Sequence, residues 1–331
     1  MRTNDIIHLG LLLCSLAAAY LVPFELLLLA YVVLGPAHYI TEISWLHDRR
    51  YFLPHRGIAA LLAVLAVVGI LMTNTSWLGI ALWAALIVCA VLAASASVIE
   101  GMLTFMAAIA LSLLIYSAES SFFVIGVLLP TLVHVSLFTL VFMALGAHRS
   151  GSRAQAGIIV VYLAAIAILL VVPPTAEVRI ESFAKAGREY FDNVGPALGK
   201  LFGRDDLKLD TRLTGLLAFV YTYHYLNWFI KTEVIRWADV PKSRLALMVV
   251  ASAVSTGLYF YNYTLGFILL LVLSLAHVLL EFPLNALAVR ELGGVAASGL
   301  RRTVGGARVE APRQPPRTRS SKPAKPPRRA A

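Results

Sequence analysis

The feature that most constrains the fold is a series of ten apolar segments, each near the ~20 residues that a helix needs to cross a bilayer. The chain is 59% hydrophobic and only 14% charged. Because lipid offers no hydrogen-bond partner to the backbone, each segment is expected to be a helix. The sequence therefore predicts an all-α polytopic membrane protein with about ten transmembrane helices. The expected spans lie at roughly 5–22, 24–46, 57–73, 77–98, 102–118, 121–146, 156–173, 213–235, 244–261 and 264–288.

The positive charges of the short loops predict the orientation of these spans, because cytoplasmic loops carry an excess of Lys and Arg. Basic residues follow the second, sixth, eighth and tenth spans, and they include Arg49, Arg149, Arg236 and Arg290. The loops at 73–76, 117–121 and 261–264 hold no Lys or Arg. Both termini are therefore expected in the cytoplasm.

Two regions are predicted from the distribution of charge. Residues 1–290 form the helical bundle, and its one long connection, 173–212, lies on the outer face and could hold a surface helix. Residues 291–331 form a disordered, basic, Pro/Arg-rich cytoplasmic tail. Eleven of the 28 Lys and Arg residues lie between 290 and 331. The tail is expected to be attracted to anionic membrane lipids. Without a folded nucleic-acid-binding module, no nucleic-acid partner is expected.

Four histidines lie inside apolar segments: His38, His134, His224 and His277. An ionisable side chain at that depth is costly and is a candidate functional residue. In the predicted topology all four lie on helices that run in the same direction, roughly 12–18 Å from the cytoplasmic end of their spans. Four imidazoles at one depth are suited to a single buried transition-metal ion. The remaining histidines are interpreted as interfacial, with His47 and His148 as reserve candidates near a cytoplasmic entrance.

Two of these histidines are followed one helical turn later by a carboxylate, as His38-x-x-x-Glu42 and His277-x-x-x-Glu281. Each glutamate can ligate the metal or accept a hydrogen bond from a metal-bound imidazole. We favour the second role, because four imidazoles fill most of a coordination sphere. The alternative is a glutamate paired with Arg or Lys at the membrane surface.

Aromatic and amide side chains near the histidines are expected to line a pocket for a flat or greasy substrate. Close packing of helices is the alternative interpretation. The candidates are Tyr39, Tyr223, Tyr225, Asn227 and Trp228.

Other functions remain open for the four histidines. They could ligate haem in pairs, or form a proton or solute path in a transporter or channel. No catalytic residue distinct from the metal ligands is identified, and the sequence leaves the oligomeric state open.

Four short motifs resemble those of the Brp/Blh family, the bacterial membrane β-carotene 15,15′-dioxygenases. Gly-Pro-Ala-His-Tyr-Ile-Thr-Glu at 35–42 is similar to the first histidine motif of that family, and Ala-His-Val-Leu-Leu-Glu-Phe at 276–282 is similar to its late motif. Leu-Val-His-Val at 132–135 and Tyr-His-Tyr at 223–225 fall where the second and third motifs occur. The third family motif has a further histidine where this chain has Trp228.

The resemblance implies an integral protein of the bacterial inner membrane that binds Fe(II), or another transition metal, through histidines. It implies a non-haem oxygenase that acts on an apolar carotenoid, isoprenoid or lipid. Carried over to this chain, His38, His134 and His224 would be iron ligands, and His277 would have to supply the fourth imidazole.

Overall fold

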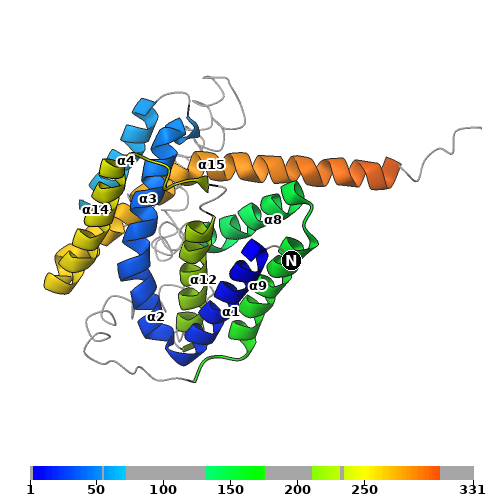
Figure 1. Ribbon diagram of the computed structural model, residues 1–331, viewed down its shortest axis with the longest axis horizontal. Helices are drawn as coiled ribbons and strands as arrows, with labels where there is room; N and C mark the ends of the chain where they lie inside the picture. The colour runs from blue at the N-terminus through cyan, green and yellow to red at the C-terminus, as the bar shows by residue number, and fades with distance from the viewer. Residues whose placement is uncertain (1–2, 54–55, 72–131, 176–210, 232–234, 306–331) are drawn as a thin grey trace, which may run out of the picture. The chain divides into compact units, whose positions relative to one another are not determined.

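The computed structural model describes residues 3–53, 56–71, 132–175, 211–231 and 235–305. All regular secondary structure in these residues is helical (Figure 1). The expected spans at 77–98 and 102–118 and most of the loop 173–212 lie outside the described residues. The helices are α1 (Thr3–Leu21), α2 (Pro23–Leu29), η1 (Ala30–Leu34), α3 (Gly35–Asp48), η2 (Arg50–Phe52), α4 (Arg56–Leu71), η4 (His134–Phe138), α8 (Thr139–Ser150), α9 (Arg153–Val171), α12 (Thr211–Ile230), α14 (Lys242–Tyr261) and α15 (Tyr263–Gly305).

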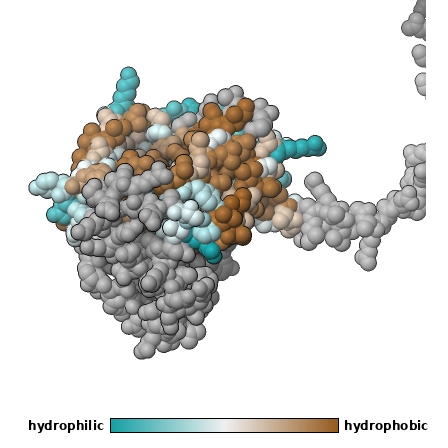
Figure 2. Space-filling view, turned by 90° about the horizontal axis from the view of Figure 1, so that it is seen from below, coloured by the Kyte–Doolittle hydropathy of each residue, from teal (hydrophilic) through white to brown (hydrophobic). Residues whose placement is uncertain are grey.

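Five helical stretches in this part of the chain are long and apolar enough to cross a membrane: Asn4–Leu21, Pro23–Asp48, Arg153–Val171, Lys242–Tyr261 and Tyr263–Ser298. Their outer faces carry large apolar side chains, such as Val171 at 77% exposure and Leu247 at 67%. Brown, hydrophobic atoms cover much of the described surface in Figure 2. An apolar surface of this extent is unfavourable in water and is the expected surface of a protein that contacts lipid.

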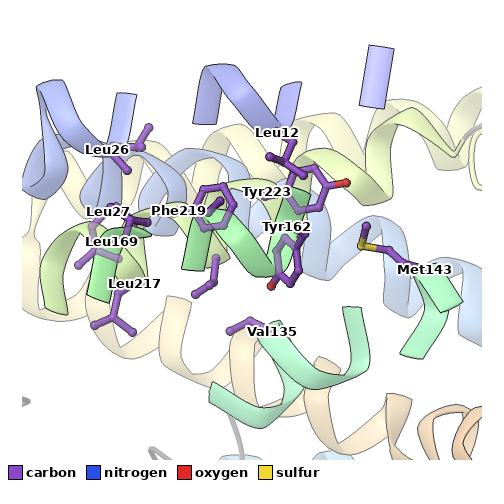
Figure 3. Close-up of a cluster of buried hydrophobic side chains, with 14 of the residues drawn as sticks. Leu12, Leu26, Leu27, Val135, Met143, Tyr162, Leu169, Leu217, Phe219 and Tyr223 are labelled. Carbon is purple, nitrogen blue, oxygen red and sulfur yellow. The ribbon is translucent and has the colours of Figure 1, made fainter. Parts of the chain in front are cut away.

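Helix α12 is the central element of the bundle. It packs against α1, α2 and α9 and against the short segments η1 and η4. Its side chains join those of α1, α2 and α9 in a large apolar cluster that includes Leu12, Leu27, Leu169 and Phe219 (Figure 3). Because its neighbours cover it, α12 does not need an apolar surface, and it is less apolar than the five membrane-length stretches.

A proline explains the irregular backbone before α3. Pro36 lacks an N–H, so the carbonyl of Val32, four residues earlier, loses its usual helical donor. The chain forms the π-helical turn η1 at this point. Thr256 of α14 donates a hydrogen bond to Val32 O at 2.9 Å. The α14 hydroxyl therefore replaces the missing backbone donor and links the two helices.

The C-terminal region differs in part from the expected tail. Helix α15 continues to Gly305, so residues 291–305 are helical rather than disordered. The helix continues although the stretch holds four glycines, which are poor helix formers. Proline, the strongest helix breaker, does not occur before Pro312. Residues 306–331 lie outside the described residues.

The hydrogen bond from Thr256 is expected to stabilise the bundle. Thr256→Val keeps the shape of the side chain but leaves Val32 O without its donor, which should lower the free energy of unfolding by about 0.5–1.5 kcal/mol. Unfolding of the purified protein in detergent micelles measures this change. Ser252→Ala is the matched control, because the Ser252 hydroxyl bonds only to Met248 O of its own helix. Equal effects of the two substitutions would contradict the role of Thr256.

Candidate metal centre

The structure brings the four histidines of the apolar segments together from four separate helical segments. His38 lies on α3, His134 is the first residue of η4, His224 lies on α12 and His277 lies on α15. His38, His134 and His277 are at most 2% exposed. The four histidines that the sequence assigns to one site therefore lie in one cluster.

The four imidazoles form a closed ring in which each is nearly perpendicular to its two neighbours. The ring centroids of His38 and His224 are 4.8 Å apart, and those of His224 and His134 are 5.0 Å apart. The ring closes through His277, which lies 5.0 Å from His134 and 5.2 Å from His38. Imidazole nitrogens about 2.1 Å from one ion place neighbouring ring centres about 5 Å apart. The spacing therefore matches four ligands of one ion.

The nitrogen positions lead to the same conclusion. One nitrogen from each of the four histidines lies within 4.8 Å of the others. Nε2 of His277 lies 3.2 Å from Nε2 of His134. Among the described residues, Nδ1 of His38 and Nε2 of His224 have no hydrogen-bond partner. Buried polar atoms are usually paired, so this group of residues could hold a metal ion.

Thr139 fixes the proton of His224. The Thr139 hydroxyl donates its one hydrogen to Val135 O at 2.9 Å and lies 2.7 Å from Nδ1 of His224. A hydroxyl that gives its hydrogen to Val135 O can only accept a hydrogen bond from that nitrogen, and this arrangement corresponds to the tautomer of His224 with its proton on Nδ1. The lone pair of His224 is then on Nε2, which is the nitrogen without a partner.

The π-helical turn at His134 places Thr139 in this position. In segment η4 the backbone hydrogen bonds join residues five apart instead of four apart. Such π-helical turns are frequent at functional sites. Hydroxyl groups satisfy two carbonyls here, because Ser136 donates to Leu132 O at 2.5 Å and Thr139 donates to Val135 O. The sequence analysis missed Thr139, and a threonine within an apolar span gives no signal that distinguishes it.

The two glutamates lie buried beside the histidines and not at the surface. Glu42 is 2% exposed and Glu281 is 4% exposed. Oε2 of Glu42 lies 3.0 Å from Nε2 of His38, and Oε2 of Glu281 lies 3.2 Å from Nδ1 of His134. His134 therefore has one nitrogen near His277 and the other near a carboxylate, an arrangement typical of metal-bound histidines.

Three of the five aromatic and amide candidates lie against the histidines. Tyr39 stacks on His277 with the ring centroids 4.3 Å apart, and its hydroxyl is 2.6 Å from that of Tyr225. Tyr225 and Trp228 contact His38, with centroid distances of 4.9 and 5.5 Å.

The other two candidates have different surroundings. Tyr223 packs against Tyr162 and Phe219 in the apolar cluster of α1, α9 and α12, whereas Asn227 is buried on α12. The reserve candidates His47 and His148 are exposed and do not belong to the histidine group.

Thr139→Val should weaken metal binding, because it removes the acceptor that holds the His224 proton on Nδ1. The loss of such a supporting group typically lowers metal affinity by about 10- to 100-fold. Competition with a chelator of known affinity measures the change. Thr139→Ser keeps the hydroxyl and should bind metal nearly as tightly as the wild-type protein. Wild-type affinity in Thr139→Val would contradict the role of Thr139.

Comparison with known proteins gives no relative for this chain. No protein-family model, no curated protein and no solved structure matches it. The resemblance to the Brp/Blh motifs therefore stays a prediction from the sequence. What the described residues establish is a helical protein with membrane-length apolar helices and a buried His/Glu group that could hold a metal ion.

Proposed function

We propose that the chain is an integral-membrane metalloenzyme that binds Fe(II), or another transition metal, through His38, His134, His224 and His277. Its activity is the oxygenation of an apolar carotenoid, isoprenoid or lipid. The observation that carries this proposal is the closed ring of four buried imidazoles, with one nitrogen of each within 4.8 Å of the others.

The set of ligands favours a transition metal. Imidazole suits Zn, Cu, Fe and Ni, whereas Mg and Ca prefer oxygen. A bound iron would supply the activation of O₂. The protein would hold the imidazoles in place through Thr139 and the two glutamates, and it would keep water from the site by burial.

The surroundings favour an apolar substrate. Tyr39, Tyr225 and Trp228 place flat aromatic surfaces next to His38 and His277. A lipid-soluble substrate can reach the protein through the bilayer that its apolar helices contact. For a polyene, O₂ would cleave one carbon–carbon double bond and place one oxygen atom in each of two carbonyl products. This reaction balances without an added reductant.

The geometry favours a single ion over bis-histidine haem. Two axial nitrogens on opposite faces of a haem iron are about 4 Å apart, with a flat macrocycle between them. Nε2 of His134 and Nε2 of His277 are 3.2 Å apart. Two further imidazoles occupy the remaining sides of the ring.

Metal analysis tests the first half of the proposal. The wild-type protein, purified in detergent and loaded anaerobically with Fe(II), should retain iron, and His38→Ala combined with His277→Ala should lose it. The exposed His148→Ala is the matched control and should retain it. Absence of retained metal in the wild-type protein would overturn the proposal.

Product analysis tests the second half. Bacterial cells that accumulate a carotene should form shorter carbonyl products when they express the wild-type chain, but not with the double histidine variant. The His148→Ala chain should behave as the wild type does. Liquid chromatography of the pigments measures this difference. If metal-loaded protein instead catalyses solute flux in proteoliposomes and leaves carotenes and lipids unchanged, the chain is a transporter.

A further inference from the structure

The two His-x-x-x-Glu pairs form a second group of possible ligands. Residues four apart lie on the same face of a helix, so α3 presents His38 and Glu42 together and α15 presents His277 and Glu281 together. Glu42, His277 and Glu281 each offer one ligand atom, and these atoms lie within 4.8 Å of one another. His277 belongs both to this carboxylate group and to the four-histidine ring.

Both carboxylates have an oxygen atom without a partner. Glu42 and Glu281 share a side-chain hydrogen bond, which requires a proton on one of the two carboxyl groups, and each is almost completely buried. Oε2 of each glutamate makes no hydrogen bond within the part of the chain that the structure describes. Two adjacent buried carboxylates repel each other when both are charged. A bound cation would remove this repulsion, and the unpartnered oxygens would be its ligands.

The short distances to the histidines are not hydrogen bonds. Nε2 of His38 and Oε2 of Glu42 are 3.0 Å apart, but neither atom makes a hydrogen bond with good geometry. The same holds for Nδ1 of His134 and Oε2 of Glu281 at 3.2 Å. These carboxylate oxygens are therefore left without a hydrogen-bond donor among the described residues.

We propose that Glu42, Glu281 and His277 form a second site for a divalent transition-metal cation, next to the ion of the histidine group. With both ions bound, His277 would be a ligand of the second ion, and His38, His134 and His224 would hold the first. The centre would then be dinuclear. Its six side chains, four histidines and two glutamates, come from four helical segments. Dinuclear centres of helix bundles likewise use six ligands from four helices, with carboxylate and histidine residues paired on two of them. The mixture of oxygen and nitrogen ligands suits Fe(II) or Mn(II).

The number of bound ions tests this proposal, which rests on the proposed function only through the first ion. Purified wild-type protein loaded anaerobically with Fe(II) should hold two equivalents of iron per chain, measured by mass spectrometry of the metal. Glu42→Gln and Glu281→Gln should each hold one equivalent. Glu291→Gln is the matched control, because the Glu291 carboxylate lies on the same helix and pairs with Arg149. It should hold two.

Each other outcome has a definite meaning. One equivalent of iron in the wild-type protein, unchanged in both Gln variants, would overturn the second site while the proposed function stands. The carboxylates would then act only as partners of the histidines. No retained iron in any variant would overturn both proposals. If the Gln variants fail to fold, X-ray absorption of the wild-type protein decides, because a metal–metal scattering shell supports the second site and its absence overturns it.

Discussion

The cost of burying polar atoms in an apolar bundle is the constraint on which the rest of this structure depends. Each imidazole and carboxylate that leaves water for this interior needs a partner, because an unsatisfied buried group costs about 1–3 kcal/mol. The structure places six such side chains in one place and leaves several of their atoms unpartnered among the described residues. A metal ion could satisfy imidazole nitrogen and carboxylate oxygen together.

Departures from regular helix geometry position this cluster. The π-helical turn η1 precedes the helix that carries His38, and η4 begins at His134. Each turn frees or redirects backbone carbonyls, and hydroxyl groups then act as their donors. Thr256 donates to Val32 O across two helices, and Thr139 donates to Val135 O and lies within hydrogen-bond distance of Nδ1 of His224. The same side chains therefore repair the backbone and orient the site.

The sequence predicted the helical class and the four histidines, because polar residues in long apolar segments are conspicuous. The position of the two glutamates one turn after His38 and His277 predicted that they would lie near the site. The π-helical turn at His134 and the role of Thr139 could not be predicted, since both depend on contacts between distant helices. Tyr223 and Tyr225 are both tyrosines of α12, yet only Tyr225 contacts His38. The angular position of each residue around the helix becomes visible only when its neighbours are placed.

The burial of α12 has a consequence for how the protein is made. This helix carries Asn227, His224 and several tyrosines and threonines, so it would enter lipid less readily than its more apolar neighbours. The helices that cover it, α1, α2 and α9, all precede it in the chain. During synthesis they would already be in the membrane when α12 leaves the ribosome, and they offer it a protein surface in place of lipid. The helices would therefore enter the membrane in chain order. His224 would enter after the helices that surround it, and His277 would enter last.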